Sequence, residues 1–153
     1  MRARIARILV ALATVVAGGI LASPSAHATD PHVTWRDDAT GRCLNMQPAT
    51  VSAVDTGSCG TLAHPWWTDW AQSDGTWLES PWGRRDLCLT AYWDRTAYLE
   101  YCTPNNDYEK WYEEWQGNGW RLRNKATNLY LDSNSKGDVY ALPWNGGNYQ
   151  LWH

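Results

Sequence analysis

Side chains that could carry out catalysis are few in this sequence, and their spacing matches no common catalytic motif. Nucleophilic catalysis needs a Ser, Cys or Thr beside a His and an orienting acid. His32, His64 and His153 lie near the ends of the mature chain or beside a proline, and no nucleophile motif accompanies them. Glycoside hydrolysis needs two carboxylates that flank a sugar, and no spacing among the glutamates singles out a pair. We therefore expect no enzymatic activity.

The balance of charges is acidic, which argues against nucleic acid or an anionic membrane as the partner. The chain has 13 Lys and Arg against 16 Asp and Glu, a formal net charge of −3. The adjacent Glu113 and Glu114 stand beside Lys110 and Trp115, a pattern typical of a solvated face. No stretch after residue 28 is apolar enough to cross a bilayer, so we expect no membrane insertion.

The aromatic composition points to binding. The chain has 12 Trp and 8 Tyr but no Phe. Trp and Tyr each combine a large apolar face with a polar group. Such residues fill the core of a small domain, and they also suit a surface that binds a ligand with flat apolar faces and hydroxyl groups. Both uses are expected here, because these residues outnumber what one small core requires.

The first 28 residues have the features of a secretory signal peptide. Three arginines come first, a nearly apolar run covers residues 8–16, and Ala26-His27-Ala28 is a small-x-small cleavage site. We expect cleavage after residue 28. Residues 29–153 would then form one secreted, extracellular domain.

The four cysteines, Cys43, Cys59, Cys88 and Cys102, all lie after the signal peptide. An even number of cysteines in an exported protein predicts disulfides, and three pairings are formally open. A zinc site is the alternative, but it is disfavoured because the chain has no Cys-x-x-Cys pair and its histidines are not at ligand spacing. We expect neither a metal ion nor another cofactor.

The sequence repeats itself three times, which determines its organisation more than any local pattern. Trp67, Trp111 and Trp152 are spaced by 44 and 41 residues, and residues 35–45 match residues 122–132 position by position. The repeats cover about residues 33–75, 76–119 and 120–153. Trp152 is thus the third of three equivalent residues, and a threefold arrangement would bury it beside the other two.

Each repeat consists of short stretches rich in Val, Tyr, Trp and Leu, separated by Asp, Asn, Gly and Thr. Apolar residues alternate with polar ones in these stretches, which is typical of strands. Residues 108–115 are the least strand-like and are compatible with a helical turn. We expect about four strands in each repeat, and so about twelve short strands in a closed all-β fold, because closure removes exposed sheet edges.

The repeated motifs resemble the ricin B-chain type β-trefoil lectin family over essentially all of residues 29–153. The first motif is Gly-x-x-Leu-Arg-Asn. A Thr follows it, and then Cys-Leu-Asn in the first repeat or Leu-Asp in the third. The last motif is the closing Gln-x-Trp. The closing motif is intact only as Gln150-Leu151-Trp152, since the second repeat has Glu109-Lys110-Trp111 and the first has Pro65-Trp66-Trp67. The resemblance implies a β-trefoil that binds sugars without a metal or a cofactor.

The resemblance also implies one disulfide within each of the first two repeats, Cys43–Cys59 and Cys88–Cys102. Each would close a loop that contributes about 3 kcal/mol on the loop-entropy model. In the third repeat the equivalent positions hold Tyr130 and Trp144. We expect this aromatic pair to replace the disulfide by packing.

The resemblance implies one shallow sugar pocket in each repeat. An Asp after the Cys-Leu position binds two hydroxyls, an aromatic ring on the next strand stacks on the sugar, and an amide near the closing motif adds hydrogen bonds. The platform position here is a leucine, and Tyr140, two residues earlier, would point to the same side of the strand. The predicted carbohydrate-binding residues are Asp132, Tyr140, Leu142, Asn145, Asn148 and Gln150. In the alternative interpretation the Asp caps a turn and the Gln holds the repeat together.

The first two repeats depart further from this pattern. In the first repeat Asn45 replaces the Asp, Gly57 takes the platform position and Pro65 replaces the Gln. In the second repeat Thr90 replaces the Asp, and Glu100 takes the platform position. A sugar site of the ordinary kind is therefore expected mainly in the third repeat.

The second repeat carries an unusual group of aromatic residues. Tyr98 parallels Tyr140, and Tyr92, Trp93 and Trp82 lie nearby in the sequence. These side chains form either an unorthodox aromatic binding surface or simple core and loop packing.

The prediction for function is a secreted, non-catalytic lectin module that recognises galactose-type sugars or a polysaccharide. The alternative belongs to another functional class, a secreted β-trefoil that binds a protein as an inhibitor or a surface-interaction module. The degenerate sugar positions of the first two repeats favour this alternative, so a protein partner is retained as a candidate.

Overall fold

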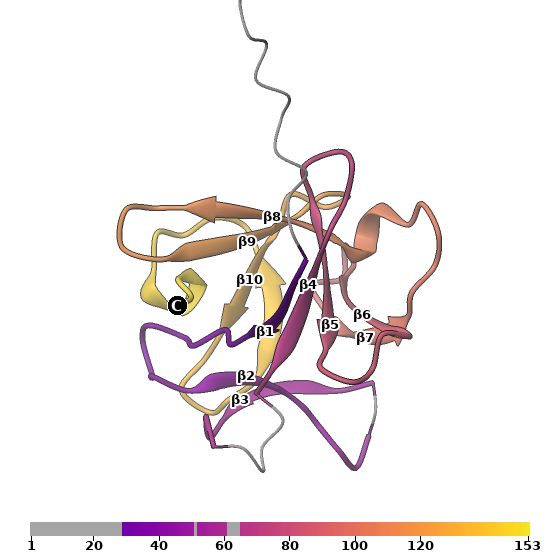
Figure 1. The fold of residues 1–153 in the computed structure, drawn as a ribbon. Helices are drawn as coiled ribbons and strands as arrows, with labels where there is room; N and C mark the ends of the chain where they lie inside the picture. The colour runs from indigo at the N-terminus through magenta and orange to yellow at the C-terminus, as the bar shows by residue number, and fades with distance from the viewer. Residues whose placement is uncertain (1–28, 51, 61–64) are drawn as a thin grey trace, which may run out of the picture.

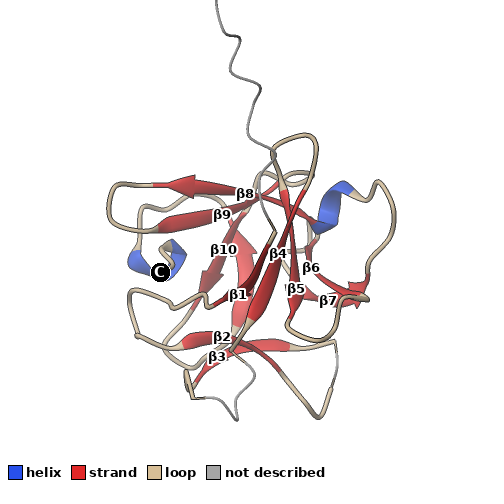
Figure 2. Cartoon of the chain, viewed as in Figure 1, coloured by secondary structure: helices blue, strands red, loops and turns tan. Residues whose placement is uncertain are grey.

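The computed structural model describes residues 29–50, 52–60 and 65–153, and almost every element in these ranges is a strand (Figure 1). The predicted signal peptide and His64 lie outside the described residues. The strands are β1 (Asp30–Val33), β2 (Cys43–Met46), β3 (Val54–Gly57), β4 (Trp67–Ala71), β5 (Trp77–Pro81), β6 (Leu87–Ala91), β7 (Ala97–Tyr101), β8 (Lys110–Trp115), β9 (Trp120–Asn124), β10 (Tyr130–Ser133) and β11 (Val139–Leu142). Two short 3-10 helices, η2 (Asp107–Glu109) and η3 (Asn148–Gln150), accompany them (Figure 2).

Strands from all three repeats form a closed ring. Strands β1, β4, β5, β8 and β9 are hydrogen-bonded neighbours in that order. The last residues of the chain close the ring, because Trp120 and Trp152 exchange backbone hydrogen bonds of 2.8 and 2.9 Å, and so do Arg36 and His153. The predicted twelfth strand is therefore present as a short bridging segment, and the predicted closed all-β architecture is confirmed.

The remaining strands form three hairpins, β2–β3, β6–β7 and β10–β11, one from each repeat. The hairpins contact one another through isolated bridges between Asp55 and Asp138 and between Thr96 and Tyr140. Figure 1 shows β2–β3 below the ring and β6–β7 to its side. No helix within the described ranges has the length and apolar character needed to cross a membrane.

The closing tryptophans occupy equivalent places in the core. Trp67, Trp111 and Trp152 are each 0% exposed. Each indole N–H donates to the backbone carbonyl of a leucine in the first strand of its own repeat's hairpin, at distances of 2.9, 2.8 and 3.2 Å to Leu44, Leu89 and Leu131. Burial of the ring is thus combined with a satisfied polar group, which explains the use of Trp rather than Phe.

Disulfides join Cys43 to Cys59 and Cys88 to Cys102, the pairing that the resemblance implies. In the third repeat the rings of Tyr130 and Trp144 lie 5.2 Å apart, so the predicted replacement of a disulfide by aromatic packing is confirmed. The guanidinium carbon of Arg121 also lies 3.1 Å from the Trp144 ring centroid, which adds a cation–π contact to this pair.

The stretch predicted to be least strand-like divides into two parts. The helical turn is η2, which begins at Asp107 and ends at Glu109, and residues 110–115 form the regular strand β8. Asn106 caps η2, since its side chain accepts a hydrogen bond from the Tyr108 N–H at 3.1 Å. A cap of this kind satisfies an N–H at the start of a helical turn.

Candidate functional site

A cavity of about 540 Å³ opens over the β10–β11 hairpin of the third repeat. Four of the six predicted binding residues line it, namely Asp132, Tyr140, Leu142 and Asn145. Five lining residues were not predicted, namely Ser133, Asn134, Ser135, Gly147 and Tyr149. The cavity is therefore rich in hydroxyl and amide groups and includes two tyrosine rings.

Asp132 and Tyr140 stand directly opposite each other in the antiparallel pair β10–β11. Asp132 is only 2% exposed, and its carboxylate accepts a hydrogen bond from the Asn145 amide at 3.0 Å. Burial raises the pKa of the Asp132 carboxyl, while hydrogen bonds from Asn145 and Gln150 act in the opposite direction. The result is an oriented carboxylate at the cavity wall that can accept a hydrogen bond from a hydroxyl group of a ligand.

Tyr140 is held in place by its own hydroxyl, which donates to the Ser133 carbonyl at 2.8 Å. The ring is half-buried, and burial and the nearby Asp132 carboxylate raise the pKa of the phenol. The hydroxyl therefore stays protonated at neutral pH and keeps this hydrogen bond. Its ring is then a fixed apolar surface, as stacking against the C–H face of a sugar requires.

Gln150 is 0% exposed and lies behind the cavity wall. Its side-chain oxygen accepts from the Asn145 N–H at 3.0 Å, and its side-chain nitrogen donates to the Pro143 carbonyl at 3.1 Å. These contacts hold the segment that carries Asn145. Asn148, in η3, is exposed and lies outside the cavity lining. The structure therefore brings neither Asn148 nor Gln150 to the cavity.

The second repeat holds the corresponding segment in the same way. Glu109, the counterpart of Gln150, is 1% exposed, and both of its carboxylate oxygens accept from the Thr103 N–H, at 3.0 and 2.9 Å. Thr90 stands in the Asp position, and its hydroxyl donates to the Cys88 carbonyl at 3.2 Å. The Asp position of this repeat is therefore used within the fold.

The described residues of the first repeat do not reproduce the cavity wall of the third. Asn45 is 5% exposed, and its amide donates to the Ser58 carbonyl at 3.2 Å. Gly57 stands opposite Cys43 in β2–β3, and a Cβ at position 57 would lie 2.8 Å from the Asn45 amide nitrogen. An aromatic platform cannot be accommodated at position 57 without moving that amide.

A second polar cluster lies in the ring, where Asp69, Glu79 and Glu113 place one carboxylate oxygen each within 4.8 Å of the others. Glu79 is 0% exposed and accepts from the Trp35 indole N–H at 3.0 Å. Burial and the neighbouring acids raise the pKa of Glu79 well above its usual value. The prediction that Glu113 lies on a solvated face is wrong, because its strand β8 turns it toward these acids.

Comparison with solved structures identifies the architecture. No protein-family model matches the chain. The designed threefold symmetric protein ThreeFoil superposes with a TM-score of 0.69 at 19% identity, over 81% of this chain and 97% of that one. The chain is a β-trefoil.

Two other solved structures that match are a protein bound to a saccharide and an endo-β-galactosidase. SeviL, in a structure bound to the asialo-GM1 saccharide, matches with a TM-score of 0.62 at 18% identity, over 79% of this chain and 91% of SeviL. An endo-β-galactosidase from Clostridium perfringens that releases GlcNAcα1-4Gal matches with a TM-score of 0.69 at 13% identity, over 80% of this chain and 32% of the enzyme. At identities this low, the superpositions establish the shared fold and nothing further.

Proposed function

We propose that residues 29–153 form a single secreted domain that binds glycans without catalysis, with repeats at about residues 33–75, 76–119 and 120–153. The observation that carries the proposal is the cavity of the third repeat, where a carboxylate, an amide and two tyrosine rings meet. The two disulfides suit an oxidising, extracellular location. The β-trefoil neighbour SeviL, whose structure contains a saccharide, supports this ligand class.

The proposed binding mode assigns one task to each side chain. The Asp132 carboxylate accepts hydrogen bonds from sugar hydroxyls, and the Asn145 amide adds polar contacts. The Tyr140 ring stacks on the C–H face of the sugar. Gln150 acts behind them as a positioning residue. The sugar is of the galactose type or belongs to a polysaccharide, and with one small cavity the dissociation constant should be about 0.1–1 mM.

The test is a screen of mature residues 29–153 against a glycan array and insoluble polysaccharides, followed by calorimetry with the best ligand. Asp132→Asn should weaken binding at least about tenfold, because it removes a charged acceptor worth about 1.5–3 kcal/mol. Tyr101→Ala is the matched control, since Tyr101 is 72% exposed and lies outside the cavity lining. An Asp132→Asn variant that binds as tightly as the wild type would overturn the assignment.

A second candidate function is protein binding, which large exposed aromatic side chains favour. Trp93 is 63% exposed, Tyr101 is 72% exposed and Trp115 is 57% exposed. Exposed aromatic residues are enriched at protein interfaces. A chain that binds no glycan but inhibits a protease, or captures one defined protein whose binding is lost in Trp93→Ala or Trp115→Ala, would support this function instead.

A further inference from the structure

The second and third repeats carry tyrosines at two equivalent positions. In the third repeat Tyr140 faces Asp132 across β10–β11, and in the second repeat Tyr98 faces Thr90 across β6–β7. The middle residue of the following 3-10 helix is also a tyrosine in both repeats, Tyr149 in η3 and Tyr108 in η2. The two repeats therefore build the same pair of rings on the same elements.

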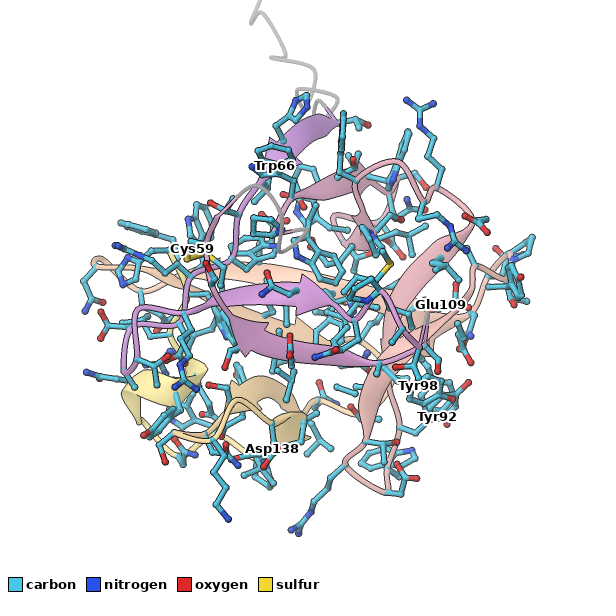
Figure 3. The ribbon with its side chains drawn as sticks, turned by 90° about the horizontal axis from the view of Figure 1, so that it is seen from below. Cys59, Trp66, Tyr92, Tyr98, Glu109 and Asp138 are labelled. Carbon is cyan, nitrogen blue, oxygen red and sulfur yellow. A yellow bond between two sulfur atoms is a disulfide. The ribbon has the colours of Figure 1, made fainter. Side chains whose placement is uncertain are left out.

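In the second repeat a third ring, that of Tyr92, stacks against both members of the pair. The ring centroid of Tyr92 is 6.0 Å from that of Tyr98, with an interplanar angle of 17°, and 4.5 Å from that of Tyr108, with an angle of 23°. Figure 3 shows Tyr92 and Tyr98 side by side, with Glu109 close to them. All three rings are half-buried and nearly parallel.

The edge of this inserted ring is held by polar groups. The Tyr92 hydroxyl donates to Glu100 at 3.1 Å, and the Tyr98 hydroxyl donates to the other Glu100 oxygen at 3.3 Å. Asn106 donates to Glu100 as well, at 3.3 Å. Burial and the Glu100 carboxylate raise the pKa of Tyr98 to about 12 and also raise the pKa of Tyr92, so both phenols remain donors at neutral pH. The second repeat thus holds a six-membered ring by its faces and by a hydroxyl at its edge.

In the third repeat the position equivalent to Tyr92 is Asn134, two residues after Asp132. Its side chain is turned into the hairpin loop, where the amide nitrogen donates to Asp138 at 2.8 Å and the oxygen accepts from the Gly137 N–H at 3.1 Å. Asn134 lines the cavity that also includes Tyr140 and Tyr149. The position that carries a stacked tyrosine ring in the second repeat thus carries a short side chain beside a cavity in the third.

We propose that Tyr92 is a built-in occupant of the second repeat's ring slot, the space between Tyr98 and Tyr108. The corresponding slot of the third repeat, between Tyr140 and Tyr149, takes the ring of an external ligand. Each chain then has one open slot, and the ligand enters as a single ring with both faces against tyrosines. That this ring is a sugar rests on the proposed function. The slot itself rests on the geometry of the two repeats.

The first experiment counts slots with p-cresol, the side-chain analogue of tyrosine, by NMR titration of residues 29–153. The wild type should bind one p-cresol, and Tyr92→Asn, which introduces the third-repeat residue, should bind two. Tyr92→Phe is the matched control, because it keeps the ring and should still bind one. A Tyr92→Asn variant that binds no more p-cresol than the wild type overturns the proposal.

The reciprocal experiment fills the third-repeat slot. Asn134→Tyr should weaken p-cresol binding at least tenfold, whereas Asn134→Ala, which loses the same loop hydrogen bonds without adding a ring, should keep it. This pair also decides the matter if Tyr92→Asn fails to fold. Retention of binding in Asn134→Tyr at wild-type strength refutes the slot assignment.

The wild type and the same four variants are then titrated with methyl β-D-galactopyranoside and methyl β-D-glucopyranoside. If p-cresol follows the expected pattern and neither sugar binds any variant, the slot is supported and the proposed function fails for these sugars. If a sugar binds the wild type and is unaffected by Asn134→Tyr, the proposed function survives and the slot assignment is wrong. A sugar that gains a second site in Tyr92→Asn supports both.

Discussion

Gln150 offers a sharp test of whether the closing motif builds the cavity wall or touches the ligand. Its side chain is fully buried and bonds to the backbone at Asn145 and Pro143. Gln150→Ala removes the acceptor for the Asn145 N–H and the donor for the Pro143 carbonyl, together with a longer contact of 3.5 Å to the Leu142 carbonyl. The segment that presents Asn145 to the cavity is thereby released.

The magnitude follows from the two shorter contacts. A net hydrogen bond contributes about 1 kcal/mol, and a partly buried group left without its partner costs about 1 kcal/mol or more. Gln150→Ala should therefore lower the free energy of unfolding by about 2–4 kcal/mol. For a domain of this size that corresponds to a fall in Tm of roughly 10 °C. Gln150→Glu keeps the acceptor, as Glu109 does in the second repeat, and should lose about half as much.

The assay is urea unfolding followed by tryptophan fluorescence, combined with calorimetry on the glycan that the screen identifies. Asn148→Ala is the matched control, because Asn148 belongs to the same 3-10 helix and is exposed. It should change stability by less than about 0.5 kcal/mol. The reasoning is refuted if Gln150→Ala leaves stability within that range and still abolishes glycan binding, since Gln150 would then contact the ligand.

Three further predictions concern stability, each measured by urea unfolding of the mature domain. Glu79→Gln should stabilise the protein by about 1 kcal/mol or more at pH 8 and little at pH 4. Because the pKa of Glu79 is raised, the protonated side chain stabilises the fold fully below about pH 4.5. This stabilisation is lost as pH rises through the folded-state pKa. An equal effect at both pH values would contradict this. Replacing Cys43 and Cys59 by Ser should cost about 3 kcal/mol, because the bridge spans a sequence separation of 16. A fall of less than about 1 kcal/mol in the free energy of unfolding would show that this disulfide stabilises the domain less than loop entropy predicts. Trp152→Ala should cost about 3–5 kcal/mol, because the ring is 0% exposed, and an unchanged midpoint would refute its core placement.

The fold could be predicted from the sequence because the same residue pattern occurs in all three repeats. Trp67, Trp111 and Trp152 recur at a nearly constant period, and the structure places all three at 0% exposure with equivalent hydrogen bonds. Alternating polar and apolar residues indicated strands in the same way. The closure of the ring could not be predicted in detail, because it depends on backbone hydrogen bonds between Arg36 and His153. Such bonds do not require a particular side chain at either position.

The candidate site was predicted only in part. The resemblance pointed to Asp132 and Asn145, and strand alternation pointed to Tyr140 in place of the leucine at the platform position; all three line the cavity. Whether the Gln150 amide faces a ligand or the backbone depends on the path of the loop around it, which a motif does not specify. Tyr149 was missed, although a tyrosine next to the closing Gln recurs as Tyr108 in the second repeat and was the available signal.

Glu113 shows the limit of charge patterns. A pair of adjacent glutamates on a strand necessarily sends one side chain to each face. Glu114 accepts from Arg123 at 2.6 Å on the outer part of β8, so Glu113 is turned toward Asp69 and Glu79.

The most direct test of the central claim is calorimetric titration of the glycan identified by the array into wild-type residues 29–153, Asp132→Asn and Tyr140→Ala. We expect one site per wild-type chain with a dissociation constant of about 0.1–1 mM. Each variant should weaken binding at least about tenfold while its far-ultraviolet circular dichroism stays unchanged. Binding of equal strength in all three proteins, or no binding to any glycan by the wild type, would contradict a sugar site over the β10–β11 hairpin.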